Sequence, residues 1–296
     1  MSELLTCTPK SLPRDLWIRA ADTATAINPV NHPRLDRLGL VVDDFTLTRA
    51  AIAVVTTKYW GTGGVHLTVG FLDNPPKALR TRLLSHMNAW SKTANVKFVE
   101  SSVSPDVRIA RVENDGYWSY VGTDITHIPA GQPTMNLDSF TMNTPESEFH
   151  RVVRHETGHT IGCPHEHMRR ELVNLIDPAK AITFFQATQG WNAAMTRAQV
   201  LTPIEESSLL GTPQSDPHSI MCYQIPGSIT KSGQPIVGGL DIDASDAAFI
   251  GGIYKKPKVV RPKKKSAPKK KKPVAKKSSK AMKGSTIRER AMRIRR

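Results

Sequence analysis

The segment HETGHTIGCPHEH, residues 155–167, constrains the fold of this chain more than any other segment does. His155 and His159 are four residues apart, so on a helix both imidazoles project from one face and can share a metal ion. Gly162 then ends the helix, because glycine adopts the left-handed conformation at low cost. The turn that follows returns His165 toward the same point. The spacing therefore predicts a helix that breaks so that three histidines converge.

This ligand set predicts a catalytic zinc ion, one per chain. Three neutral imidazoles leave one coordination position open, whereas a structural zinc site is closed by four protein ligands. Glu156 lies beside the first histidine, where it can take the proton of a zinc-activated water as a general base. The alternative is a helix with incidental surface histidines. The added requirement for Gly162 and His165 makes such a chance match improbable.

Hydrophobic periodicity predicts an α+β domain around this motif. The expected elements are strands at residues 65–72, 96–99, 107–112 and 134–137, and helices at residues 75–95, 144–162, 178–187 and 244–253. Residues 114–131 are expected to form a loop. In the helix that carries the motif, Thr144 suits the N-cap and Pro145 suits the first helical position.

Charge divides the chain into a mildly acidic body and a strongly basic tail. The chain has 296 residues and a formal charge of +15. Residues 255–296 hold 20 Lys and Arg and one acidic residue, or +19, so the first 254 residues hold 21 basic and 25 acidic residues, or −4. The Lys, Pro, Ala and Ser of the tail bury too little apolar surface to offset the entropy of ordering, which predicts disorder over residues 256–296.

This tail can contact nucleic acid or another polyanion, because lysines neutralise phosphates. It can equally bind an acidic membrane surface or act as a nuclear address, and a merely solvated tail is the alternative. The interleaved prolines and the lack of aromatic residues disfavour base stacking.

The histidine motif resembles the long zinc-binding motif of the metzincin metallopeptidases. Glu166, directly after the third histidine, makes it most similar to the astacin family. SIMCY, residues 219–223, is similar to the methionine turn of astacins, Ser-x-Met-His-Tyr, with Cys222 in place of the histidine. WSYVG, residues 118–122, is also similar to an astacin segment ahead of the edge strand of the sheet. The resemblance covers about residues 60–255 and is specific at the zinc motif and the methionine turn.

The resemblance implies an α+β, zincin-like fold with a twisted mixed β-sheet, an active-site helix and an irregular lower subdomain. Met221 would form an apolar floor under the histidines, and Glu166 would contact the N-terminus of the matured enzyme. Tyr223 would be an additional, retractable zinc ligand that also stabilises an oxyanion. Simple packing is the alternative role for Tyr223. Gly162, Glu166 and Met221 are thus expected to be structural residues at the site.

The predicted activity is that of a zinc-dependent metalloendopeptidase. Its expected metal ligands and catalytic residues are His155, His159, His165, Glu156 and Tyr223. An extended peptide is expected to pair with an edge strand near residues 134–138. One alternative is a catalytically idle zinc protein that acts through its basic tail, which the intact Glu156 disfavours. Another is a different zinc hydrolase with the same ligands, which the turn at Met221 disfavours.

The expected organisation is an N-terminal segment at residues 1–44, which could be a removable pro-segment, a catalytic domain at residues 45–255, and the tail. A monomer is expected. The first thirty residues contain no basic stretch followed by an apolar core, and no apolar run near the N-terminus approaches the ~20 residues of a membrane helix. These features favour a cytoplasmic location and leave secreted and nuclear locations open.

Three cysteines are too few for a disulfide-rich scaffold. Cys163 and Cys222 both fall near the predicted site, where they could form a disulfide or remain buried thiols. A Cys7 thiolate could cap the zinc in a latent form, although nothing in the sequence links residue 7 to the site. His167 is expected to be a surface residue.

Overall fold

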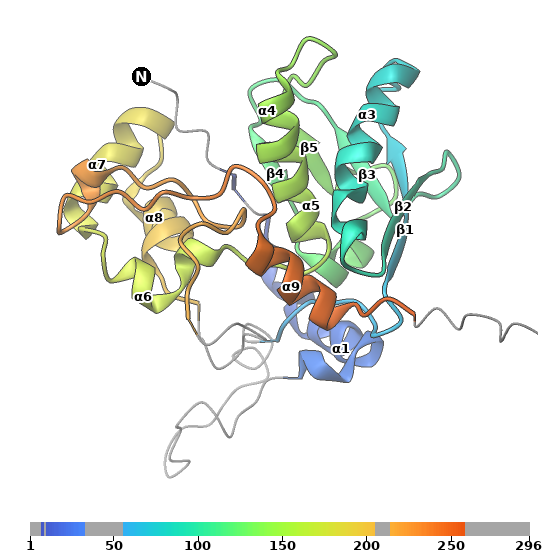
Figure 1. Cartoon of the computed structure of the whole chain (residues 1–296), viewed down its shortest axis with the longest axis horizontal. Coiled ribbons are helices and arrows are strands. Elements are labelled where there is room, and N and C mark those ends of the chain that lie inside the picture. The colour runs from blue at the N-terminus through green and yellow to red at the C-terminus, as the bar shows by residue number, and fades with distance from the viewer. Residues whose placement is uncertain (1–6, 9, 33–55, 205–213, 258–296) are drawn as a thin grey trace, which may run out of the picture. The chain divides into compact units, whose positions relative to one another are not determined.

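Five strands form one mixed sheet in the order β2-β1-β3-β5-β4 (Figure 1). The computed structural model describes residues 7–8, 10–32, 56–204 and 214–257. The strands are β1 Val65–Phe71, β2 Val96–Glu100, β3 Val107–Ala110, β4 Tyr117–Ser119 and β5 Met135–Leu137. β1, β2, β3 and β5 run parallel to one another, whereas β4 runs antiparallel to β5. The expected mixed sheet is confirmed.

The apolar runs in the sequence become the centre of this sheet. All four residues of β3 and all three of β5 are buried, as is typical of parallel strands covered on both faces. β1 instead alternates at its start, with Val65 and Leu67 buried and His66 exposed. Its register is fixed by pairing Val65 with Val96 on one side and Val69 with Val107 on the other.

The edge of the sheet differs from the prediction. Residues 114–131 were expected to be a loop, but they contain β4, which is the edge strand. The expected edge at residues 134–138 is β5, an inner strand. The reason is that β4 has only three residues and follows a tight turn, in which Asn114 and Gly116 have φ values of 64° and 68°. Such a short strand has no periodicity that a sequence can reveal.

Two helical segments pack beside the sheet (Figure 1). The predicted helix at residues 75–95 is α3, Lys77–Met87, continued by a 3-10 helix at Asn88–Lys92. Its apolar stripe of Leu79, Leu83, Met87 and Trp90 is buried in the main core. The second segment comprises α4 Glu146–Glu148, a π-helical turn at Phe149–Val153, and α5 Arg154–Thr160.

The start of this second segment also differs from the prediction. Pro145 is the N-cap, with extended φ and ψ of −56° and 148°, and not the first helical residue. Thr144 does not cap the helix; its hydroxyl accepts a hydrogen bond from the Thr141 amide. The predicted end is confirmed, because Gly162 has a φ of +107° and the chain turns there. A side chain at Gly162 would in addition lie 2.8 Å from the Tyr59 ring.

The lower part of the chain is short helices joined by irregular segments, as expected. It comprises α6 Arg170–Val173, α7 Pro178–Gln189, α8 Ala193–Thr196, a π-helical turn at Arg197–Leu201, a 3-10 helix at Gly227–Ile229, and α9 Ala244–Ile253. Asp177 caps α7 by accepting from two backbone amides, and Gly190 ends it in the left-handed conformation. A second apolar cluster around Phe185 and Ile225 joins α6, α7 and the 3-10 helix at Gly227–Ile229, whereas Ile250 of α9 is buried in the main core.

The N-terminal residues are packed on the same unit, Met1–Pro257. They form a 3-10 helix at Arg14–Leu16, then α1 Trp17–Ile27, then a 3-10 helix at Pro29–Asn31. The predicted boundary at residue 44 lies outside the described residues, and so does the tail from residue 258 onward, which is the second unit, Lys258–Arg296. Within the described ranges, no helix combines the length and the apolar character needed to cross a bilayer.

Two buried asparagines connect this N-terminal part to the strand that enters β1. The Asn31 amide donates to the carbonyls of Ala24 and Tyr59, and its oxygen accepts from the Tyr59 amide and the Thr57 hydroxyl. Asn28 donates to the Trp60 carbonyl. Asn31 therefore pairs both backbone groups of Tyr59 and adds a second donor to the Ala24 carbonyl, which also accepts from the Asn28 amide.

We predict that Asn31→Ala lowers the free energy of unfolding by about 3 kcal/mol, because buried backbone donors and acceptors lose their partner. Chemical denaturation measures this difference. Asn143→Ala, at an exposed position, is the matched control and is expected to change stability by less than about 0.5 kcal/mol. Equal stability of the two variants would contradict the anchoring role of Asn31.

Candidate metal centre and active site

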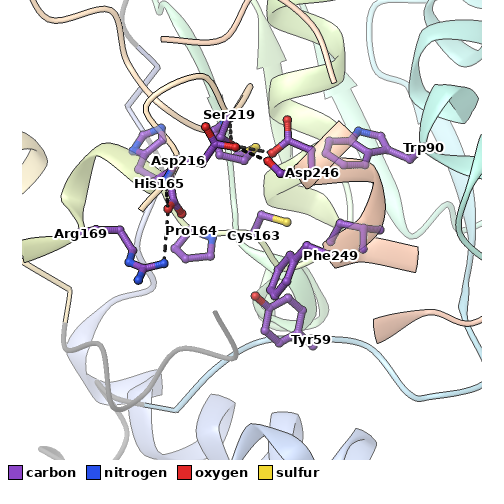
Figure 2. Close-up of a pocket in the computed structure, with 14 residues that line it drawn as sticks. Tyr59, Trp90, Cys163, Pro164, His165, Arg169, Asp216, Ser219, Asp246 and Phe249 are labelled. Carbon is purple, nitrogen blue, oxygen red and sulfur yellow. Dashed lines mark hydrogen bonds and ion pairs between the residues drawn. The ribbon is translucent and has the colours of Figure 1, made fainter. Parts of the chain in front are cut away.

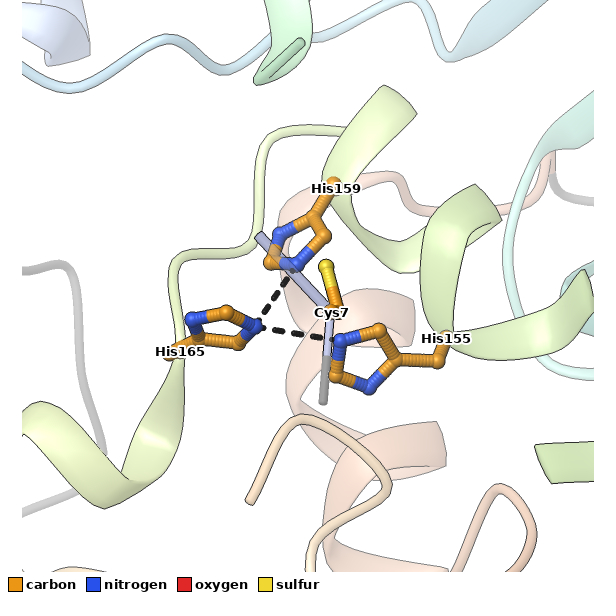
Figure 3. Close-up of side chains that lie close together, drawn as sticks. All are labelled: Cys7, His155, His159 and His165. Carbon is orange, nitrogen blue, oxygen red and sulfur yellow. Dashed lines mark hydrogen bonds between the residues drawn. The ribbon is translucent and has the colours of Figure 1, made fainter. Parts of the chain in front are cut away.

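Three imidazoles converge where the motif predicted they would (Figure 3). His155 and His159 project from α5, and His165 follows the turn at Gly162. The Nε2 atom of His165 lies 3.2 Å from that of His155 and 3.1 Å from that of His159. Imidazole nitrogens about 2.05 Å from a tetrahedral zinc ion are about 3.3 Å from one another. The spacing therefore fits a single zinc ion.

The tautomers of two of these histidines support the same conclusion. His155 Nδ1 lies 2.6 Å from the Ile220 carbonyl, and His159 Nδ1 lies 2.8 Å from the Cys163 carbonyl. A carbonyl oxygen only accepts, so both Nδ1 atoms carry the proton and both Nε2 atoms present lone pairs. Burial lowers the pKa of His155 to about 4 and that of His159 well below its usual value, which keeps both rings neutral. Converging lone pairs in a buried site favour a cation between them.

A second histidine cluster provides a contrast. His86, Glu146 and His150 also lie close enough together to hold an ion. Here Arg154 donates to Nδ1 of His86 and lies next to Nε2 of His150. Nε2 of His86 therefore donates to Glu146, and Nδ1 of His150 donates to Asp241. Every ring nitrogen of this cluster has a hydrogen-bond partner. It is a complete polar network at the start of the active-site helix.

Glu156 lies beside the three imidazoles and is almost fully buried. Its Oε2 accepts a hydrogen bond from the Cys7 thiol, 3.4 Å away. Burial raises the pKa of this carboxyl to about 8. A carboxylate with a raised pKa is a stronger base, which suits a group that must take a proton from water near neutral pH.

Met221 lies against the motif helix from the side of the methionine turn. A Cβ on Gly158 would lie 2.4 Å from Met221 Sδ, so only glycine fits between the two histidines of α5 at this contact. The backbone adds a second link, because the Glu166 amide donates to the Met221 carbonyl at 2.8 Å. The methionine turn and both sides of the histidine motif are therefore one packed unit.

Asp246, at the start of α9, is a residue that the sequence analysis missed. Its carboxylate accepts from the Ser219 hydroxyl at 2.6 Å and from the Ile220 amide at 2.9 Å. The carbonyl of Ile220 is the acceptor for His155 Nδ1. Asp246 also closes the capping box with Asp243. The Asp-x-x-Asp spacing indicates such a cap, but only the fold brings it to the methionine turn.

Tyr223 is buried beside the third histidine. Its ring lies 4.4 Å from that of His165 between centroids, and it stacks on His167 at 3.8 Å and 18°. The phenol oxygen has no hydrogen-bond partner among the described residues, and burial raises its pKa well above the usual value. The prediction for His167 is wrong, because this ring is buried and its Nε2 bonds to the Gln199 carbonyl at 3.0 Å. It fills the space behind Tyr223.

Glu166 lines a pocket that His165 also lines. Figure 2 shows His165, Arg169 and Asp216 around this pocket. The Glu166 carboxylate accepts from the Asp216 amide at 2.9 Å and pairs with Arg169 at 3.4 Å. Burial raises its pKa to about 7. Aromatic rings, including those of Tyr59 and Phe249, line the rest of the pocket. His165 is the only one of the three converging histidines that reaches it, so this pocket is separate from the side that Glu156 faces.

Of the two alternatives for Cys163 and Cys222, the structure has the buried thiols. All three cysteines are free thiols, so Cys163 and Cys222 do not form a disulfide. Cys7, which the sequence linked to nothing, is buried with its sulfur in the same group of ligand atoms as the three histidines. A lone cysteine 148 positions before the motif gives no local signal of this proximity.

The comparisons with known proteins agree with this geometry. Residues 55–226 match the family model "Astacin", which describes a family of peptidases. The chain belongs to the astacin family. This confirms the family and the metzincin fold that the motif predicted, and it makes the chain a member of a family of metalloendopeptidases.

Individual relatives cover different shares of the chain. It is 34% identical over 125 residues to zinc metalloproteinase nas-27 of Caenorhabditis elegans, a match over 41% of this chain and 26% of that protein. The chain thus spans about a quarter of that relative. A structure of myroilysin is similar with a TM-score of 0.63 and 27% identity, covering 68% of this chain and 97% of that one. Another myroilysin structure is similar with a TM-score of 0.52 and 29% identity, and the match covers 67% of this chain and 86% of that one.

We predict that Asp246→Asn weakens zinc binding about 10- to 100-fold. If the oxygen of the new amide accepts from Ser219, its NH₂ group faces the Ile220 amide, and two donors then oppose each other. This displaces the Ile220 carbonyl, which orients His155. Competition with a chromogenic chelator measures the affinity. Asp243→Asn is the control, since asparagine caps a helix as well as aspartate does. Unchanged affinity in Asp246→Asn would contradict the link.

Proposed function

We propose that this chain is a zinc-dependent endopeptidase that holds one zinc ion through His155, His159 and His165. The observation that carries this proposal is the convergence of three imidazole nitrogens directly beside a buried carboxylate, Glu156. When bound, zinc acts as a Lewis acid that activates water and polarises the scissile carbonyl. Membership of the astacin family supports the choice of metal and reaction.

The residues of the chain have separate tasks in this reaction. Glu156 takes the proton of the attacking water at a carboxylate oxygen and delivers it to the nitrogen of the leaving amine. Tyr223 donates its phenolic hydrogen to the oxyanion that develops on the carbonyl. Its unpartnered hydroxyl and its position against His165 support this task. Met221 and Asp246 hold the histidines in place and take no part in the proton transfers.

The substrate that fits best is an extended peptide added to the outer edge of β4. The carbonyls of Tyr117 and Ser119 on this edge already accept hydrogen bonds from the backbone amides of Thr8 and Lys10. This edge can therefore accept a strand, which is the usual way for a peptide to bind beside a sheet. Thr8 and Lys10 lie on this edge, so it is accessible to a substrate only when they leave.

The alternative of an idle zinc protein has less support. A site that only binds zinc does not need a carboxylate in position to act as a base. Glu156 is nevertheless buried at a cost that shows in its raised pKa. A role in proton transfer explains why the fold buries a carboxylate at this unfavourable free energy.

The basic tail supports a second, independent interaction. Residues 255–296 carry a charge of +19 and the first 254 residues carry −4, so the attraction to a polyanion is concentrated in the tail. We propose that these residues bind nucleic acid or a similar polyanion while the catalytic unit acts on peptides. The removable pro-segment proposed for residues 1–44 is compatible with both peptide hydrolysis and polyanion binding.

We predict that Glu156→Gln abolishes hydrolysis and leaves zinc bound. The comparison uses a Cys7→Ala background, because Cys7 lies against the same carboxylate. Cleavage of a peptide library is expected to fall at least about 1000-fold, while metal analysis still finds one zinc per chain. Glu148→Gln, on the same helical segment outside the site, is the matched control.

Two further measurements define the outcome for Glu156. A chelator is expected to remove the activity of the parent, and added zinc is expected to restore it. A fully active Glu156→Gln variant would overturn the assignment of the base. Failure of the parent to bind zinc would overturn the proposed function itself.

For the tail, we predict that the full chain elutes from immobilised heparin at higher salt than a chain that ends at Pro257. Binding of the full chain to duplex DNA should weaken linearly on a plot of log affinity against log salt. The shortened chain retains the whole first unit and is the control. Equal elution of both proteins would show that the tail is only solvated.

A further inference from the structure

We propose that His167 is a positioning residue for the third zinc ligand, and that its Nδ1 accepts a hydrogen bond from the Nδ1–H group of His165 when the metal is bound. This inference rests on the proposed zinc site and names a residue that acts through one of its ligands. The other two ligands, His155 and His159, donate from Nδ1 to backbone carbonyls. Nδ1 of His165 has no hydrogen-bond partner among the described residues. The third ligand therefore requires an acceptor of its own.

The proton of His165 belongs on Nδ1. Its Nε2 lies 3.2 Å from that of His155 and 3.1 Å from that of His159, so Nε2 is the atom directed at the shared ion. A neutral imidazole that offers a lone pair at one nitrogen carries its proton on the other. The ring is only 2% exposed. His165 thus presents a buried donor, and buried donors in folded proteins are almost always paired.

His167 presents the complementary group, a buried acceptor. Its Nε2 lies 3.0 Å from the Gln199 carbonyl, which only accepts, so Nε2 carries the proton. The ring is fully buried, which disfavours a charged imidazolium. Nδ1 of His167 therefore has a lone pair, and this atom too has no hydrogen-bond partner within the described part of the chain.

The lower part of the chain fixes the orientation of the His167 ring. Gln199 lies in the π-helical turn at Arg197–Leu201, and carbonyls in the last turn of a helix have no partner within the helix. A second bond joins the same segments, because the Ile204 amide donates to the Met168 carbonyl at 2.9 Å. These two bonds fix the direction of the Nδ1 lone pair of His167.

The rings of His165 and His167 are adjacent. Their centroids are 4.8 Å apart, and their planes differ by 42°. His165 is the N-cap of the 3-10 helix Glu166–Met168 and has an extended backbone, with φ of −69° and ψ of 127°. An extended residue and the residue two positions later present their side chains to the same side. At this spacing, small ring rotations bring the two Nδ1 atoms to a hydrogen-bond distance of about 3 Å.

The neighbouring polar groups are not suited to either role. Tyr223 stacks on His167 with 18° between the planes, so its hydroxyl lies over the face of the ring, whereas the Nδ1 lone pair lies in the ring plane. The carboxylate of Glu166 accepts from the Asp216 amide and pairs with Arg169. The donor of His165 and the acceptor of His167 are therefore matched to each other.

The first test uses amide side chains that replace one ring nitrogen at a time. Asparagine places its amide where Nδ1 of His167 lies, and glutamine places its amide where Nε2 lies. His167→Asn thus keeps an acceptor for His165, His167→Gln keeps the bond to Gln199, and His167→Phe keeps only the ring. We expect zinc affinity to fall about 10- to 100-fold in His167→Gln and His167→Phe, and to stay within about threefold of the wild type in His167→Asn. Competition with a chromogenic chelator measures the affinity.

This order of affinities separates positioning from packing. Phenylalanine preserves the stack on Tyr223 and fills the buried volume, whereas asparagine leaves a cavity. A purely structural role therefore predicts that His167→Asn binds zinc most weakly and His167→Phe most tightly among the three variants. His66→Gln, at an exposed position on β1, is the control for removal of a histidine and is expected to bind zinc as the wild type does.

The second test observes the hydrogen bond directly, by nuclear magnetic resonance of the zinc-loaded full chain with ¹⁵N-labelled histidine. We expect His167 to carry its proton on Nε2, and the two Nδ1 atoms of His165 and His167 to show a coupling across the hydrogen bond. The N–H signal of His165 should shift in His167→Phe, while those of His155 and His159 stay in place.

The outcomes separate this inference from the proposed function. A proton on Nδ1 of His167, or a His165 signal that is the same in the wild type and in His167→Phe, would overturn the positioning role and leave the zinc site standing. An affinity order with His167→Asn last leads to the same conclusion. If the wild type binds no zinc, both proposals fail. If the variants do not fold, the position of the His167 proton and the coupling in the wild type still decide.

Discussion

Two backbone carbonyls determine the geometry on which the rest of this molecule depends. Those of Ile220 and Cys163 accept from the Nδ1 atoms of His155 and His159 and so direct both Nε2 lone pairs to one point. Neither carbonyl is on the helix that bears the rings. The metal centre is therefore defined by the folding of separate segments onto α5, and the helix alone would leave both imidazoles free to rotate.

Each of those segments is fixed by a different interaction. The methionine turn is held by the Asp246 carboxylate at the start of α9. The turn after α5 depends on the positive φ of Gly162. The contact between the methionine turn and α5 is made by Gly158 and Met221, where no side chain larger than hydrogen fits. Loss of any one interaction misaligns the imidazoles without touching a ligand.

The sequence predicted the parts of the site that depend on local spacing. The four-residue interval of His155 and His159, the stop at Gly162 and the apolar stripe of α3 all follow from helix geometry. The edge strand β4, the link from Asp246 to the methionine turn and the position of Cys7 did not follow. Asp246 and Cys7 depend on partners 26 and 149 residues away, and β4 depends on its pairing with β5. No periodic pattern records such pairings.

The close contact between Met221 and α5 has a consequence for oxidation. The sulfur already touches the space where Gly158 lacks a side chain, so there is no room for an oxygen atom added to it on that side. Oxidation of Met221 to the sulfoxide would push α5 away from the methionine turn and replace an apolar contact with a polar one. The affinity for the metal ion would then fall although the three histidines themselves stayed chemically unchanged.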